Sequence, residues 1–158
     1  MEWEEKDQVK KGNIGEAIVQ SYLEGRGWTV YTPKTKGAHW FDLLCCKGKE
    51  QVIALDVKTK ARFNKWNAQG INIRSYNQYL NFLEVSSINF YLIFIDDKTG
   101  DVHLADLNEI KNKGFTPNND KLIAWKLTDM KLLFRIEDKM IEKLSSFDTR
   151  NYKFKPEL

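Results

Sequence analysis

The stretch Trp40-Phe41-Asp42-Leu43-Leu44, followed by Val52-Ile53-Ala54-Leu55-Asp56-Val57-Lys58, decides the fold and the chemistry of this chain. The apolar residues in these two segments predict two buried strands, residues 40–46 and 51–58, joined by a turn around Gly48. Asp42 and Asp56 interrupt these runs, although a carboxylate in a buried strand is costly unless it is paired or binds a metal. Two such carboxylates on neighbouring strands therefore predict a shared cation.

Counting along this hairpin gives the predicted register. A three-residue loop, residues 48–50, pairs Lys47 with Gln51 and places Asp42 opposite Asp56, with β-carbons roughly 4.5–5.5 Å apart. A four-residue loop would instead put the two acids on different faces of the sheet. Lys58 lies two residues after Asp56, so both side chains share one face. The odd-length loop predicts two carboxylates and one ammonium together.

Phosphodiester hydrolysis uses this combination of groups. A divalent cation held by carboxylate oxygens neutralises phosphate charge and acidifies a bound water. A lysine beside the cation orients that water and meets the charge that develops in the transition state. The alternative interpretation is an ordinary Asp–Lys ion pair at a strand end, with Asp42 belonging to a turn. The two acids together, followed by a basic segment, favour the metal site.

Further from this hairpin, hydrophobic periodicity predicts a helix over residues 8–24 and a short strand at 28–31. Ser75 is expected to cap a helix that runs to about Val85. Residues 59–73 show no clean periodicity and are interpreted as an excursion. Further strands are predicted at 90–95, 102–104, 121–127 and 132–136, a helix at 137–144 and a polar tail from Asp148. This order predicts one α/β domain over residues 1–158, with a mixed sheet.

The acid pattern also resembles the PD-(D/E)xK nuclease superfamily. The segment Gly12-Asn13-Ile14-Gly15-Glu16-Ala17 is similar to the helix start of its archaeal Holliday-junction-resolvase-like branch. The resemblance covers Lys11 to about Phe94 and implies a restriction-endonuclease-like core, a central mixed β-sheet flanked by helices. Phe41 stands where the motif has proline, and Asp56 stands where glutamate is commoner.

The resemblance also implies roles for individual residues. Asp42, Asp56 and the backbone carbonyl of Val57 would ligate Mg²⁺ or Mn²⁺, and Glu16 would bind the metal directly or through water. Lys58 would position or activate the attacking water. Gln78 is similar to a glutamine that some branches place near the active site.

Charge is concentrated in one segment of the chain. Between Val57 and Leu83 five basic residues occur without any Asp or Glu, whereas the remainder carries 20 basic and 22 acidic residues. Aromatic and amide side chains are interleaved with these charges, which suits a phosphate-backbone partner, although a solvated loop is the simpler alternative. The residues expected to contact nucleic acid are Lys58, Lys60, Arg62, Lys65, Trp66, Arg74 and Gln78. Trp66 could equally cover core beneath the excursion.

Composition restricts the remaining choices. The longest purely apolar run, residues 90–95, is too short to cross a bilayer, and the acidic N-terminus does not resemble a signal peptide. The adjacent Cys45 and Cys46 favour a reducing cytoplasm over a disulfide framework. No glycine-rich phosphate cradle or nucleophile with a histidine partner supports a small-molecule hydrolase.

The sequence therefore predicts a cytoplasmic, metal-dependent endonuclease that hydrolyses DNA, with structure-selective cleavage of junctions, flaps or ends compatible with the branch it resembles. RNA as the substrate and a homodimeric state remain open. The alternative hypothesis is a non-catalytic nucleic-acid-binding module on the same fold. The presence of Asp42, Asp56 and Lys58 together favours the enzyme.

Overall fold

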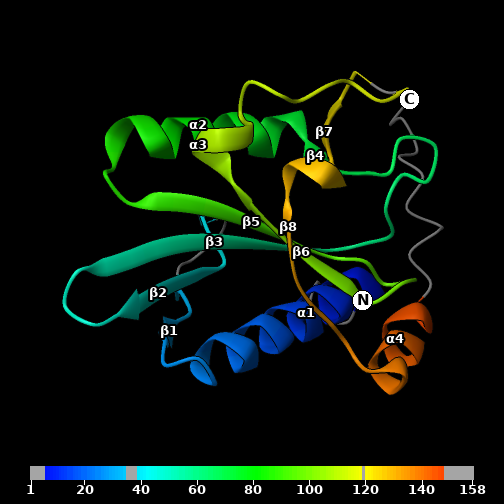
Figure 1. Ribbon diagram of the computed structural model, residues 1–158, viewed down its shortest axis with the longest axis horizontal. Helices are drawn as coiled ribbons and strands as arrows, with labels where there is room; N and C mark the ends of the chain where they lie inside the picture. Colours follow the sequence, from blue (N-terminus) through cyan, green and yellow to red (C-terminus); the bar gives the residue numbers. More distant parts are fainter. Residues whose placement is uncertain (1–5, 35–38, 119, 148–158) are drawn as a thin grey trace.

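The computed structural model describes residues 6–34, 39–118 and 120–147. In these ranges six strands form one sheet in the order β1-β2-β3-β5-β6-β8, and β4 pairs with β7 in a separate two-stranded sheet (Figure 1). β3 and β5 are parallel, while the other neighbouring pairs are antiparallel, so the large sheet is mixed. The elements are α1 (Asp7–Glu24), β1 (Thr29–Tyr31), β2 (Leu43–Lys47), β3 (Gln51–Thr59), β4 (Ala68–Asn72), α2 (Ile73–Val85), β5 (Asn89–Ile95), β6 (Asp101–Asp106), α3 (Leu107–Ile110), β7 (Leu122–Lys126), η2 (Leu127–Asp129), β8 (Lys131–Arg135) and α4 (Asp138–Ser145).

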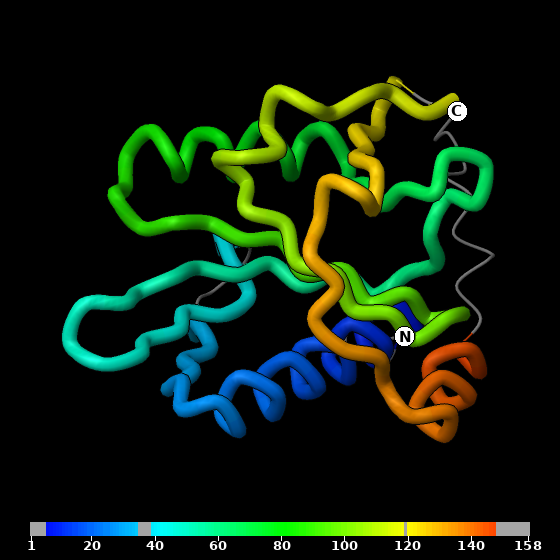
Figure 2. The backbone as a smooth tube through the Cα atoms, viewed as in Figure 1, coloured from blue at the N-terminus to red at the C-terminus, as the bar shows by residue number. Residues whose placement is uncertain are grey.

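Helices cover both faces of the large sheet. Figure 2 shows α1 and α4 on one side of it and α2 on the other. Alternation along β3 produces two cores, because Ala54 packs on the α2 side while Leu55 and Val57 pack on the α1 side. Asp56 and Lys58 follow the periodicity of Ala54 and therefore belong to the α2 side. Asp56 and Lys58 thus place polar groups at the edge of the core on the α2 side, at the end of β3.

α1 packs on the sheet through a stripe of residues four apart. Lys11, Gly15, Val19 and Leu23 are its buried positions. A β-carbon at Gly15 would overlap the Oγ1 atom of Thr59, so only glycine permits this approach of helix to strand. The contact places Glu16, the next residue, at the end of β3.

The predicted elements agree with the structure apart from small differences at their ends and the following exceptions. β2 begins at Leu43 rather than Trp40. The excursion over 59–73 was wrong in its second half, because β4 forms there by pairing with β7 across more than fifty residues. α2 begins at Ile73 and is capped by Asn72, whose side chain accepts a hydrogen bond of 2.8 Å from the amide of Arg74, and not by Ser75. The short helices α3 and η2 were not predicted, and the tail from Asp148 lies outside the described residues.

Across the ranges that the structure describes, no helix is long and apolar enough to span a bilayer.

Candidate functional site

The β2–β3 hairpin has the three-residue loop that the sequence predicts. Lys47 pairs with Gln51, and the same register continues to Leu43 opposite Leu55. At Asp42 the ladder ends, since the Asp42 amide donates instead to the carbonyl of Leu55 at 2.9 Å. The Asp42 carboxylate then accepts a hydrogen bond of 2.7 Å from the backbone amide of Val57. The acid is thereby fixed beside β3, next to Asp56.

The environment of Asp42 disfavours negative charge. Burial, and then the neighbouring charge of Asp56, raise the pKa of Asp42 to about 8, against the opposing effect of the Val57 hydrogen bond. The other oxygen of Asp42 lies 3.7 Å from Nε2 of His39, an exposed residue just before the strand. Burial and Asp56 also raise the pKa of Glu16. Three carboxylates, from α1, the residue before β2 and β3, therefore influence one another electrostatically.

Asp56 and Lys58 form an ion pair at the end of β3. The Lys58 ammonium lies 2.9 Å from Oδ2 of Asp56, whose side chain is only 6% exposed. Burial, the largest single effect, lowers the pKa of Lys58, but the charges of Asp56, Tyr79 and Asp42 and the hydrogen bond to Asp56 together raise it. Oδ2 of Asp56 is nevertheless buried without a hydrogen bond of normal geometry. The Lys58 ammonium is therefore the charged partner of this buried carboxylate oxygen.

α2 contributes a residue that the sequence interpretation missed. Gln78, the predicted contributor, is exposed, whereas its neighbour Tyr79 is buried. Asp56 and Lys58 both act on the Tyr79 hydroxyl, since the charge of Asp56 raises its pKa and that of Lys58 lowers it, and burial raises it most. The inward stripe of α2, formed by Tyr76, Tyr79 and Phe82, is the signal that could have identified it.

A cleft of about 980 Å³ adjoins this cluster, although Asp56 and Tyr79 themselves do not line it. Its lining includes Glu16, His39, Asp42, Lys58 and Lys60, which come from α1, the segment before β2 and the end of β3. Its far end is lined by Lys11 and Asp97, a buried ion pair that ties α1 to the β5–β6 turn. A cleft of this volume, with convergent carboxylates and amines, suits a polar substrate better than an apolar one.

The donor set at this cleft fits a hard divalent cation. Asp42 and Asp56 raise each other's electrostatic cost, and a cation between them would remove that cost. Oδ2 of Asp56, which has the Lys58 ammonium as its ion-pair partner but no hydrogen bond of normal geometry, could also accept a cation. No cluster of three or more His, Cys, Asp or Glu side chains suited to a metal occurs among the described residues.

Some residues of the basic segment make contacts within the protein, whereas others face the cleft or the solvent. The Arg62 guanidinium donates to Asp96 at 2.5 Å, Asp101 at 2.7 Å and Thr99 at 3.0 Å, so its donors hold the β5–β6 turn. Trp66 is half-buried and lies against Phe63 and Phe115, which fits the alternative in which it packs over the core beneath the excursion. Within the described structure these contacts stabilise the excursion itself.

The other predicted contacts lie in the cleft or on the exposed surface. Lys60 lies in the cleft, where burial and then Lys58 lower its pKa to about 8. Lys65 and Arg74 are exposed outside the cleft lining. The structure therefore brings Lys58 and Lys60 to the acids, whereas Lys65 and Arg74 lie on the surrounding surface.

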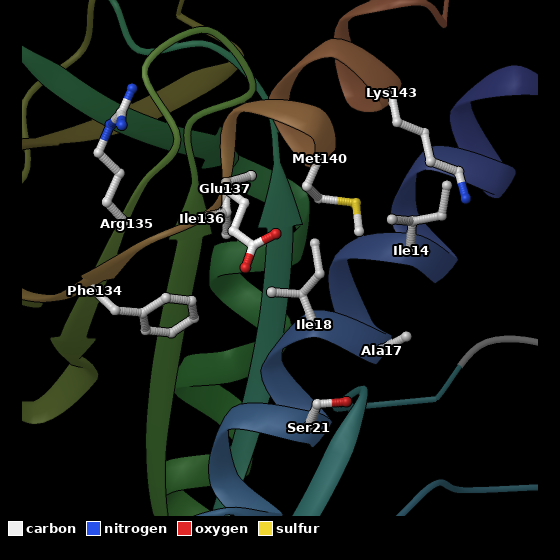
Figure 3. Close-up of a pocket in the computed structure, with 10 residues that line it drawn as sticks. All are labelled: Ile14, Ala17, Ile18, Ser21, Phe134, Arg135, Ile136, Glu137, Met140 and Lys143. Atoms are coloured by element: carbon white, nitrogen blue, oxygen red, sulfur yellow. The ribbon is translucent and has the colours of Figure 1, made fainter.

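A second hollow, of about 550 Å³, lies between α1, β8 and α4. Figure 3 shows Ile18 of α1 and Met140 of α4 pointing toward each other in it, with Glu137 among the charged residues at its edge. None of the predicted site residues lines it. The cleft, rather than this apolar hollow, is the candidate site.

No protein-family model matches the chain, and no curated protein matches it. Among solved structures the chain is similar to Hjc of Archaeoglobus fulgidus, a Holliday junction resolvase from an archaeal hyperthermophile. The TM-score is 0.52 with 12% sequence identity, and the match covers 84% of this chain and 93% of that chain. At this identity the similarity shows the fold. The chain therefore has the restriction-endonuclease-like α/β fold, a central mixed sheet flanked by helices.

Proposed function

We propose that this protein is a metal-dependent endonuclease that hydrolyses DNA phosphodiester bonds. The observation that carries the proposal is a pair of carboxylates, the half-buried Asp42 in a polar cleft and the buried Asp56 behind it, with the Lys58 ammonium beside them. Buried acids with a raised pKa and a specific charged neighbour are characteristic of functional sites. The nuclease-type fold supports the same reaction class.

Asp42, Asp56 and the Val57 carbonyl would hold Mg²⁺ or Mn²⁺. The bound cation supplies charge neutralisation at the scissile phosphate and lowers the pKa of water. Lys58 orients the attacking water and donates to the phosphoryl oxygens as their charge grows. Glu16 accepts a hydrogen bond from a water in the same cleft. The Val57 amide keeps Asp42 oriented, since it donates to one of its two oxygens.

Lys60 supports the nucleic acid rather than the reaction. Its ammonium shares the cleft with Lys58, and a phosphate between the two would relieve their mutual repulsion. Lys65 and Arg74 would contact the backbone farther along the duplex. Four-way junctions are the first substrate to test, because the structural neighbour is a Holliday junction resolvase.

The alternative function is a non-catalytic nucleic-acid-binding module. It is favoured by the absence of a three-ligand cluster in the described ranges and by the ion pair that already partners Asp56 with Lys58. In this alternative Lys58 neutralises Asp56 permanently and no metal enters. The nuclease proposal requires the cation to compete successfully with this ion pair.

A cleavage panel decides between the two functions. It contains duplex, single-stranded, flapped and four-way-junction DNA and one RNA duplex, each with Mg²⁺, Mn²⁺ or EDTA. The proposal expects cleavage of at least one DNA with metal and none in EDTA. Binding without cleavage under all conditions would favour the binding module.

The proposal extends to the setting of the protein. Residues 1–158 act as one domain, and the two free cysteines suit the cytoplasm. A homodimer would allow two strands of a junction to be cut together, and sedimentation equilibrium with and without a junction would test for it.

A further inference from the structure

Tyr79 is a buried phenol that the proposed roles leave unexplained. It projects from α2 toward the sheet with 4% of its surface exposed, and its ring stacks on Phe90 with centroids 4.6 Å apart and planes inclined by 26°. Phe90 pairs with Ala54, two residues before Asp56 on the same face of β3. The packing therefore fixes the tyrosine ring over the strand that carries Asp56 and Lys58.

A phenol can serve both members of an ion pair. Its O–H donates to a carboxylate while its oxygen lone pairs accept from an ammonium. The Tyr79 hydroxyl is subject to the charges of both Asp56 and Lys58. Asp56 needs such a partner, because its side chain is nearly inaccessible to water and Oδ2 lacks a hydrogen bond of normal geometry.

We propose, on the basis of the proposed nuclease function, that Tyr79 is a positioning residue that holds Asp56 and Lys58 in place from the α2 side of the sheet. It touches neither substrate nor reacting atoms. Val57 performs the matching task for Asp42 by donating its amide to that carboxylate. The two acids are then oriented by separate elements, one from the backbone of β3 and one from a helix.

Tyr76 provides a matched control on the same helix. Its hydroxyl donates to the carbonyl of Lys111 at 2.8 Å, and its ring lies against Trp125 rather than over β3. Tyr76→Phe and Tyr79→Phe each remove one hydroxyl and keep the ring. Any effect that is specific to the ion pair must appear in Tyr79→Phe alone.

The first measurement needs neither metal nor substrate. The two Hε protons of an immobilised lysine have separate NMR shifts, which merge when the side chain moves freely. In metal-free protein we expect separate Lys58 Hε signals, assigned by their loss in Lys58→Arg, in wild type and Tyr76→Phe. They should merge in Tyr79→Phe. Merged signals in wild type, or separate signals in Tyr79→Phe, would overturn the proposal.

The second measurement uses Mn²⁺ titration and single-turnover cleavage. Residues that orient metal ligands typically change metal affinity or activity by about 10–100-fold, and we expect at least a tenfold loss of Mn²⁺ affinity in Tyr79→Phe. KM for the DNA should stay level while kcat falls. Wild-type protein that holds Lys58 rigidly yet cuts nothing would refute the nuclease function alone, whereas normal Mn²⁺ affinity in Tyr79→Phe would refute the tyrosine role alone.

Discussion

The backbone amide of Val57 donates a hydrogen bond of 2.7 Å to the carboxylate of Asp42, where the β2–β3 ladder ends. This one contact orients an acid that lies outside both strands and keeps it beside Asp56. The hydrogen bond favours the charged form of Asp42, but burial and the nearby charge of Asp56 disfavour it more strongly. A proton or a cation on the acids resolves this conflict, so both pH and metal should change the behaviour of the protein.

The stability of the metal-free protein should fall as the pH rises from about 4 toward 8. The pKa of Asp42 is about 8 in the folded protein and roughly 4 in an unfolded chain, so the folded state binds more protons in this window. Glu16, whose pKa is also raised, acts in the same direction. Urea unfolding in EDTA at intervals from pH 5 to 8 measures the trend.

Asp42→Asn is the control for this pH dependence. It removes the charge that folding disfavours, so the variant should lose less stability than the wild type between pH 5 and 8. Lys60, with its pKa lowered to about 8, affects stability only above this window, where the folded state releases its proton first. A wild-type stability that rises across the window would contradict the assignment.

Gly15→Ala should destabilise the protein by roughly 1–3 kcal/mol, the usual cost of forcing an extra methyl group into a packed contact. The new β-carbon would overlap Thr59 on β3 and push α1, with Glu16, away from the cleft. Gly12→Ala is the matched control, because it lies in the same helix with nothing within 4 Å of the added carbon. Gly12→Ala should stabilise the helix slightly. Equal thermal unfolding of the two variants would refute the close approach.

Arg62→Ala should be a stability mutation rather than a binding mutation. Asp96 is 2% exposed and would be left as a buried charge without its cation, for which a cost of about 3 kcal/mol is typical. Lys65→Ala, nearby and exposed, should leave stability unchanged. Denaturant unfolding separates the two. If Arg62→Ala is as stable as the wild type, the prediction is wrong and Arg62 again becomes a candidate for contact with phosphate.

Lys60→Ala and Lys65→Ala together should weaken the binding of all DNA sequences to a similar extent. The dependence of log K on log salt should become flatter by up to about 0.9 for each duplex phosphate that the variant no longer neutralises. Fluorescence anisotropy in EDTA across a salt series measures the slope. An unchanged slope would place the binding surface on another face of the molecule.

Local signals made the core of this site predictable from the sequence. The loop of residues 48–50 is short enough for counting to give the register, and β3 shows which side chains share a face with Asp56. The pairing of β4 with β7 was not predictable, because a partner more than fifty residues away supplies the hydrogen bonds. Arg62 was assigned from its charge alone, and its buried partners Asp96 and Asp101 become visible only once the turn is folded.

The position of the second helix shows the same limit. Asn72 and Ser75 are both good capping residues, and only the end of β4 makes Asn72 the cap. A shift of the helix start does not alter which residues face inward. Tyr79 was nevertheless overlooked, because a buried tyrosine is usually interpreted as part of the hydrophobic core. Polar groups that serve a site from within a core are hard to recognise until the core is built.

The central claim is that Asp42 and Asp56 hold a catalytic cation while Lys58 acts in the reaction. It is tested most directly by measuring Mn²⁺ affinity and single-turnover DNA cleavage in parallel for wild type, Asp56→Asn and Lys58→Ala. Asp56→Asn should lose both metal affinity and cleavage. Lys58→Ala should keep metal affinity while cleavage falls by at least about a hundredfold, as expected for a group that acts mainly in the transition state. Wild-type protein that cuts no substrate with either metal, or cleavage that survives both substitutions, would contradict the claim.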